Sequence, residues 1–279
     1  MAVVVPSIFA SSVLEATKVD LEVAKLATDV TDMVEEIKNA GDTVHFPIIA
    51  QPKMAEKLTP GTDVTPDRVN MTDSTAKIVE IGLAQRVLDS EEIQVKGGLM
   101  DKIVVGMGRS MAQKIDYDLI DAMDKEAVYK VATGSATDLT VVELESALLK
   151  FGDKLNKNDF SAIVVNSRIY PAFMKMDDFV SASKTFAVDG SGIVENNVLG
   201  YWRGIKVVVS DNNTYDTSKN ECKTYIIKKD ALGYVMQKEI GVEEQRNVLG
   251  RSTDILTNCL MAVKVMDTKG IVLLRKTIA

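Results

Sequence analysis

The sequence predicts an α+β fold organised around one long helix, and three observations support this prediction. An apolar stripe with the period of a helix runs through residues 97–127. Two strand-like segments, residues 43–50 and 74–87, flank a connection of twenty residues. From residue 140 onward, short helical patterns are interspersed with strand-like runs, and the chain closes in two or three strands. Helices and strands are thus mixed along the chain, as in an α+β fold.

The composition is that of an ordinary globular protein, with 46% hydrophobic and 26% charged residues among 279. A net charge of −7 argues against a general affinity for nucleic acid or acidic lipid, which comes from clustered Lys and Arg. No segment approaches the ~18 apolar residues of a membrane span, and residues 1–10 lack the basic region of a signal peptide. Cys222 and Cys259 are expected to be reduced and buried. We therefore expect a protein made in the cytoplasm.

The first forty residues are expected to form an extended arm followed by a helix. Apolar residues from Leu14 to Ile37 follow a helical spacing that β-branched side chains interrupt. We therefore place the helix at about residues 20–38 and its end at Gly41.

Residues 51–70, QPKMAEKLTPGTDVTPDRVN, form a connection that is too long for a hairpin turn. Most connections in compact domains have about 4–6 residues. This connection contains three prolines, at positions 52, 60 and 66, and no aromatic residue. Taken alone, such a loop is too long and too polar for a self-contained domain.

The long helix gives the strongest periodic signal in the chain. Apolar side chains recur every fourth residue at Leu99, Ile103, Met107, Met111, Ile115, Leu119 and Met123. A helix over residues 97–127 would be about 45 Å long. Gly106 and Gly108 each weaken it by about 1 kcal/mol relative to Ala, so they are expected to mark a bend or a close backbone contact.

Capping and turn signals divide the remainder of the chain. Thr140 and Glu143 form a capping box that opens a helix to about residue 155. A strand is expected at residues 160–165, followed by a short helix through Met176 that Asn166 or Ser167 caps. The glycine-rich residues 186–200 are expected to form a loop. Strands are expected at residues 204–211, at residues 223–238 and near the end, with a tight turn at 269–270.

No constellation of residues indicates catalysis, a cofactor or a metal site. The one histidine, His45, is expected to be an ordinary strand residue, because no Cys, Ser or second His lies in a motif nearby. The Gly106–Gly108 pair lacks the third glycine of a dinucleotide fingerprint. The oxygen-rich turns at 189–192 and 211–216 lack the spacing of a calcium loop. These observations favour a structural or binding protein over an enzyme.

The order of these features resembles the major capsid proteins of tailed bacteriophages, which have the Hong Kong 97 phage capsid fold. The resemblance rests on the loop tip LTPGTDVTP (58–66), on Gly97-Gly98 and the helix segment MAQKIDYDL (111–119), and on IVVNSRIYP (163–171), YIIKKDALG (225–233) and VEEQR (242–246). It covers the chain from about residue 40 to the end.

The resemblance implies a division of the chain into the parts of that fold. Residues 1–42 would be an N-terminal arm and residues 43–88 an extended β-hairpin loop. Residues 89–135 and 235–279 would form a peripheral domain with the long spine helix, and residues 136–234 a mixed α/β axial domain.

The resemblance also implies a function, that of a capsid protein which self-assembles into hexamers and pentamers of an icosahedral head. The head would enclose double-stranded DNA without sequence-specific binding, and no membrane or cofactor is expected. No segment of the sequence resembles a fused scaffold, so a separate scaffolding protein and a portal are expected as partners. The protein would be assembled in the host cytoplasm and located in the virion.

The extended loop is expected to contact a neighbouring subunit. The loop residues expected at this contact are Lys53, Met54, Lys57, Leu58, Pro60, Asp63, Val64, Pro66 and Arg68. Glu243 and Arg246 are expected to form ion pairs across strands or between subunits. The prolines limit the entropy lost when the loop becomes ordered, and they hinder strand-to-strand aggregation before assembly.

Three other interpretations stay open at this point. The same fold is expected in an encapsulin-like shell, which would enclose protein cargo in a cellular nanocompartment. A soluble enzyme could use the long loop as a lid over an active site, but it would need a pocket lined by perturbed titratable groups. A tail-tube or surface-layer subunit would also self-assemble.

Overall fold

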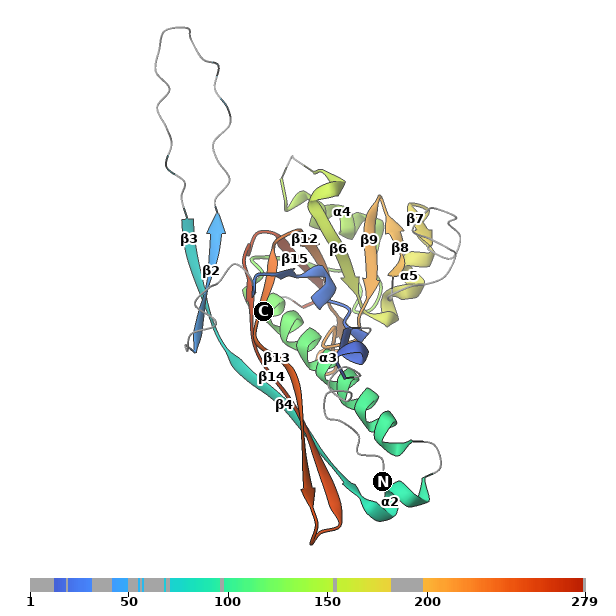
Figure 1. The fold of residues 1–279 in the computed structure, drawn as a ribbon. Coiled ribbons are helices and arrows are strands. Elements are labelled where there is room, and N and C mark those ends of the chain that lie inside the picture. The colour runs from blue at the N-terminus through green and yellow to red at the C-terminus, as the bar shows by residue number, and fades with distance from the viewer. Residues whose placement is uncertain are drawn as a thin grey trace.

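The computed structural model describes residues 13–18, 20–31, 42–49, 55, 57, 68, 71–95, 98–152, 155–181 and 198–277. Within these residues, two large sheets are joined by the long helix α3 (Leu99–Glu126) (Figure 1). One sheet has four strands in the order β1-β13-β14-β4, and the other has seven in the order β5-β15-β12-β6-β9-β8-β7. The mixture of helices and sheets confirms the predicted α+β class.

Helix α3 has 28 residues and confirms the predicted long helix. The side chains of Met107, Met111, Ile115, Leu119 and Met123 are buried, as the four-residue spacing predicts. Gly108 confirms the expected close contact, because a Cβ built there would lie 2.8 Å from the Cβ of Ala16. A Cβ built on Gly106 would meet no atom within 4 Å.

The four-stranded sheet is dominated by one long hairpin. Its strands are β13 (Leu232–Asn247), β14 (Ser252–Val265), β4 (Val79–Leu88) and β1 (Thr28–Asp29). β13 and β14 pair antiparallel, β4 pairs antiparallel with β14, and β1 pairs parallel with β13. Val87 and Ile255 of this sheet pack against Met107, so the sheet supports the first half of α3.

A second hairpin, formed by β2 (Thr43–Ile49) and β3 (Met71–Lys77), projects from the body of the subunit (Figure 1). Its register runs from Thr43 opposite Lys77 to Ile49 opposite Met71. These strands and β4 confirm the two predicted strand segments on either side of the long connection. The short helix α2 (Asp89–Gln94), which the sequence did not predict, follows β4.

The seven-stranded sheet has a different cover on each face. Its strands are β5 (Tyr129–Ala132), β15 (Ile271–Arg275), β12 (Thr224–Lys228), β6 (Phe160–Val165), β9 (Ile205–Val209), β8 (Val198–Trp202) and β7 (Phe179–Ser181). Because side chains alternate along a strand, Ile163 and Val165 belong to the core beneath α4 (Val141–Leu149) and α5 (Tyr170–Met174). Val164 belongs to the core that includes α3. The short strands β10 (Tyr215–Asp216) and β11 (Glu221–Cys222) form a separate pair.

The predicted caps are confirmed at two sites. The Thr140 side chain accepts a hydrogen bond from the backbone N–H of Glu143, which closes the capping box of α4. The Asn166 side chain accepts one from the backbone N–H of Arg168 and caps η5 (Ser167–Ile169), which continues into α5. Two further 3₁₀ turns are η1 (Ala24–Leu26) and η4 (Lys157–Asp159).

Three predicted boundaries are wrong or incomplete. Residues 13–18, which were expected in the extended arm, are helical, whereas the helix expected at 20–38 is absent from 21–30. η1 and β1 occur there instead, because backbone N–H groups bond to Asp116 of α3 and β1 pairs with β13. Residues 32–41 lie outside the described ranges. Helix α4 ends at Leu149 rather than near 155, because the chain turns at Gly152 with φ +89°. Of the loop expected at 186–200, residues 198–200 belong to β8, and the rest lies outside the described part.

Because one face of α3 is buried and the other is exposed, substitutions on the two faces should differ strongly in their effect on the free energy of unfolding. Leu119→Ala should lower the free energy of unfolding of the unassembled subunit by about 2–5 kcal/mol, because the side chain is fully buried. Gln113→Ala on the exposed face of the same helix should change it by less than about 0.5 kcal/mol. Urea unfolding of both variants measures the difference, and equal losses would contradict the packing described.

Candidate interaction surfaces

Apolar side chains are exposed together at the end of the β13–β14 hairpin. Leu249 in the turn is 97% exposed, and Val248 beside it is also exposed. Ile93 of the adjacent α2 is 85% exposed. Large apolar side chains grouped in this way mark interaction sites on protein surfaces. We refer to Ile93, Val248 and Leu249 as the tip surface.

The tip surface is held in place by contacts between α2 and the hairpin. Arg246 of β13 donates two hydrogen bonds to the Asp89 carboxylate, at 2.5 and 2.6 Å. The backbone N–H of Asp89 donates to the carbonyl of Arg251, at 3.1 Å. Since bidentate pairs between Arg and a carboxylate fix direction as well as distance, α2 and the hairpin end present their apolar side chains in one arrangement.

A second bidentate pair joins β4 to β14. Arg86 donates to both carboxylate oxygens of Asp254, at 2.6 and 2.7 Å. These hydrogen bonds lower the pKa of Asp254 below its ordinary value, and those from Arg246 lower the pKa of Asp89. Both carboxylates are therefore ionised at neutral pH.

A second surface lies on the outer side of α4 and α5. Val142 and Leu149 are exposed seven residues apart on α4, and Tyr170 and Met174 are exposed four residues apart on α5. Each helix therefore shows solvent an apolar stripe besides the face that it buries against the sheet.

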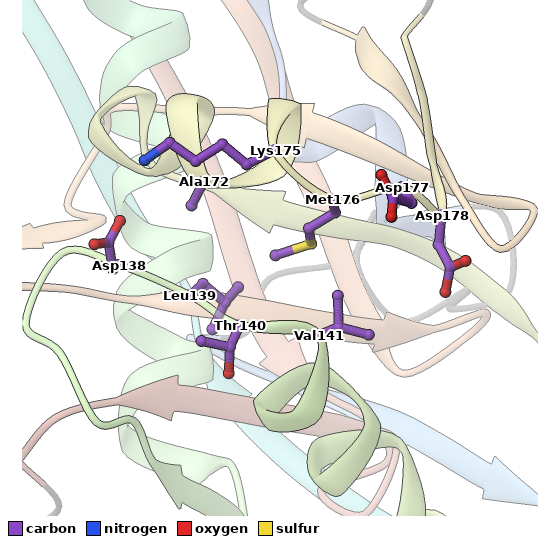
Figure 2. A pocket seen from close by; sticks show the side chains of 9 residues that line it. All are labelled: Asp138, Leu139, Thr140, Val141, Ala172, Lys175, Met176, Asp177 and Asp178. Atoms are coloured by element: carbon purple, nitrogen blue, oxygen red, sulfur yellow. The ribbon is translucent and has the colours of Figure 1, made fainter.

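An open pocket of about 500 Å³ lies between the loop before α4 and the end of α5 (Figure 2). Its lining consists of Asp138, Leu139, Thr140, Val141, Ala172, Lys175, Met176, Asp177 and Asp178. Leu139, Ala172 and Met176 are buried and form an apolar floor, whereas the aspartates and Lys175 are exposed at the rim. Arg203 lies 2.8 Å from Asp178 and 2.6 Å from Glu145.

The described residues hold no group of three or more His, Cys, Asp or Glu side chains that could bind a metal ion. His45 lies on β2 with its Nδ1 2.5 Å from Asp73 on β3. Cys222 and Cys259 are free and buried, as predicted. Burial raises the pKa of both thiols, that of Cys259 to about 11, so both stay protonated and unreactive at neutral pH. None of the described helices is long and apolar enough to cross a membrane.

Of the residues predicted to make intersubunit contacts, four lie in the described part of the chain and seven lie outside it. Arg246 pairs with Asp89 of its own chain, and Glu243 is exposed with its carboxylate 3.8 Å from Lys238 Nζ. Lys57 and Arg68 are exposed. The other seven predicted loop residues, Lys53, Met54, Leu58, Pro60, Asp63, Val64 and Pro66, lie outside the described residues. Whether any of these residues contacts a neighbour stays a prediction.

Sequence reasoning missed the tip surface. Its signal in the sequence was Asn247-Val-Leu-Gly250, a turn between two strand-like runs that carries two aliphatic residues where polar ones are usual. The exposed apolar face of α4 could also have been predicted from the residue spacing, since Val142 and Leu149 lie on the side of the helix opposite Leu144 and Ala147.

Comparison with known families gives these surfaces a context. Residues 69–274 match the model of a family described as phage capsid protein. The chain belongs to this family. It is a structural protein, the major capsid protein of a phage shell, as the sequence resemblance implied. Its place is therefore in the virion, in an oligomeric shell. Among curated protein sequences, none matches the chain.

Solved structures show the same fold at low sequence identity. The chain of Mycobacterium phage Che8 is 20% identical, with a TM-score of 0.63 over 92% of this chain and 91% of that one. A chain of Gordonia phage Cozz is 13% identical, with a TM-score of 0.63 over 93% and 87%. A virus-like particle from Pyrococcus furiosus is 16% identical, with a TM-score of 0.63 over 96% and 98%. These matches confirm the predicted Hong Kong 97-like capsid fold.

The lowered pKa values of Asp89 and Asp254 predict how their ion pairs with Arg246 and Arg86 respond to acid. Because Asp89 and Asp254 titrate below their ordinary value of 3.8, their ion pairs contribute stability at pH above that value and lose it as the pH falls through the lowered values. Carboxyl ¹³C titration by NMR on the unassembled subunit should place both transitions below 3.8. In Arg246→Ala, the transition of Asp89 should move up while that of Asp254 stays. Titration of Asp89 at or above 3.8 in the unaltered protein would contradict the pairing.

Proposed function

We propose that this capsid protein forms hexamers and pentamers that close an icosahedral head around double-stranded DNA. In this proposal, residues 1–42 are the arm, 43–88 the extended loop, 89–135 with 235–279 the peripheral domain, and 136–234 the axial domain. Helices α4 and α5 lie within the proposed axial domain, and α3 and β14 lie within the peripheral one, whereas β5 and β15 of the peripheral segments complete the seven-stranded sheet.

The β2–β3 hairpin is the observation that carries the proposal. An isolated two-stranded hairpin is marginally stable in water. Near its base, Val44 and Phe46 are buried in a small cluster with Val30, Val235 and Ala262. Toward Ile49 and Met71 it projects from the body, where the long connection begins (Figure 1). A hairpin of this kind is stabilised when it lies on a neighbouring subunit.

The tip surface supports a second contact between subunits. A contact between two different patches of identical subunits is heterologous, and such contacts close into rings when the rotation fits. The exposed Leu249 on a hairpin braced by Arg246 is suited to such a contact. We assign the predicted residues Glu243 and Arg246 to the margin of this contact, where Arg246 acts indirectly by holding α2.

The overall charge supports an interior that does not adsorb the packaged DNA. With a net charge of −7 the subunit as a whole repels phosphate. A separate scaffolding protein would then direct closure, a portal would occupy one vertex, and assembly would take place in the host cytoplasm. The two free, buried cysteines are compatible with a reducing compartment.

A second candidate function is the shell of a protein-filled compartment. The match to the virus-like particle from Pyrococcus furiosus, which covers 98% of that chain, places this fold in a particle that is not described as a phage head. Nuclease-protected DNA in shells purified from the natural source supports the phage head, whereas a co-purifying protein at constant stoichiometry supports the compartment.

Shortening the extended loop tests the proposal. Because Ile49 and Met71 are the last paired residues, an Asn-Gly dipeptide in place of residues 50–70 closes the hairpin with a two-residue turn. We expect a folded subunit that no longer forms shells, measured by sedimentation velocity and negative-stain electron microscopy. An unchanged thermal midpoint of the unassembled subunit serves as the control. Shells of normal size and yield would contradict the proposed role of the loop.

Substitution of the tip provides an independent prediction. Leu249→Asp should leave the unassembled subunit as stable as before, because the side chain is almost fully exposed, and should prevent closed shells. Leu249→Asn separates the loss of apolar area from the added charge and should also reduce assembly. Normal assembly of both variants in the same sedimentation assay would show that the tip makes no essential contact.

A further inference from the structure

A buried carboxylate in the middle of α3 holds a distant part of the chain. Asp116 is fully buried. Its Oδ2 accepts a hydrogen bond from the backbone N–H of Glu22 at 2.9 Å, and its Oδ1 accepts those of Val23 at 3.1 Å and Ala24 at 2.9 Å. These N–H groups open the 3₁₀ turn η1, so they have no partner within that turn. Asp116 therefore caps a turn that lies more than ninety residues earlier in the chain.

A carboxylate is seldom found at a fully buried position. Burial raises the pKa of Asp116, although the three backbone N–H donors and the charge of Lys25 act in the opposite direction. The ionised group thus loses more by desolvation than its partners return. A residue that only filled space at this position would be apolar, as its neighbours Ile115 and Ile120 are. The hydrogen bonds to the backbone of residues 22–24 are the feature that distinguishes Asp116.

The segment that Asp116 holds, residues 13–18 and 20–31, is here called the strap. Besides Asp116, the strap contacts α3 through Thr17 Oγ1, which donates to the carbonyl of Gly108 at 3.2 Å, and through Asp20, whose carboxylate accepts from Arg109 at 3.0 Å. Gly108 permits the close approach of the strap to α3. The first half of the strap therefore lies against the helix.

The second half of the strap reaches both sheets. Ser161 of β6 donates to the carbonyl of Leu26 at 3.3 Å, and Thr28 donates to Asp230 before β13 at 2.9 Å. β1 then pairs with β13, and the backbone N–H of Val30 donates to Tyr234 at 3.1 Å. The strap thus connects α3, the seven-stranded sheet and the four-stranded sheet of one subunit.

The end of the strap is packed against the base of the extended hairpin. Val30 lies in one buried cluster with Val44 and Phe46 of β2 and with Val235 and Ala262. A displacement of the strap would remove Val30 from this cluster. Val30 of the strap is therefore one of the contacts that hold the base of the β2–β3 hairpin.

We infer that Asp116 is a positioning residue for assembly, which holds the strap across α3 within one subunit and so fixes the direction of the extended loop. The effect on assembly rests on the proposed function. The docking of the strap does not, and it is measured on the unassembled subunit.

The first test is hydrogen exchange of the full chain carrying Asp116→Ala. The amides of residues 22–24 should exchange at least about tenfold faster, because their three hydrogen bonds to the Asp116 carboxyl group are lost. Amides of α3 and β14 should keep their protection. Asp118→Ala, which removes an exposed pair with Lys114 at 2.6 Å, is the matched control and should leave residues 22–24 unchanged. Unchanged exchange in Asp116→Ala would overturn the inference.

A second pair of variants loosens the strap without altering Asp116. In Gly108→Ala the added Cβ would lie 2.8 Å from the Cβ of Ala16 and 2.9 Å from the carbonyl oxygen of Val13, so strap amides should lose protection. Gly106→Ala on the same helix adds a Cβ that meets nothing within 4 Å, so the strap amides should keep their protection. If Asp116→Ala fails to fold, this pair still tests whether assembly requires a docked strap.

The assembly readout completes the test. Sedimentation and electron microscopy should show at least a tenfold lower yield of closed shells for Asp116→Ala and Gly108→Ala, with normal yields for Asp118→Ala and Gly106→Ala. A released strap with a normal yield of shells would overturn the positioning role. If the unaltered protein forms no shells, the proposed function fails, while the exchange measurements still decide whether Asp116 holds the strap.

Discussion

The structure depends on the burial of one helix by three different neighbours. The first half of α3 packs its methionines on β4 and β14, its centre holds the strap through Asp116, and its last turns meet the seven-stranded sheet. The apolar stripe of this 28-residue helix must be covered, and these three neighbours cover it. Both sheets and the strap are therefore placed relative to one another through α3.

The end of α3 joins the seven-stranded sheet through charged groups rather than through apolar contacts alone. Asp124 accepts a hydrogen bond from Lys223 at 2.9 Å and lies 3.6 Å from Arg275, which is itself 3.8 Å from the buried Glu221. Buried ion pairs add little net stability but are costly to break. We interpret this network as fixing the orientation of the sheet on the helix, while the apolar core supplies most of the stability.

Local signals in the sequence predicted the elements whose causes are local. The four-residue apolar spacing predicted α3, and Thr140 with Glu143 predicted the start of α4. The strap could not be predicted in this way, since its backbone groups bond to Asp116 and Tyr234, which are distant in the sequence. The prediction of a helix at 20–38 weighed helical spacing without those partners. The candidate contacts of the extended loop depend on other subunits, so neither the sequence nor a single chain tests them.

The central claim is that the exposed surfaces of this subunit are completed by copies of itself. Cryo-electron microscopy of the purified, concentrated protein tests this claim most directly. Closed icosahedral shells are expected, in which residues 50–70 and Leu249 lie against neighbouring subunits. Particles that remain single subunits, or shells in which residues 50–70 fold back on their own subunit, would contradict it.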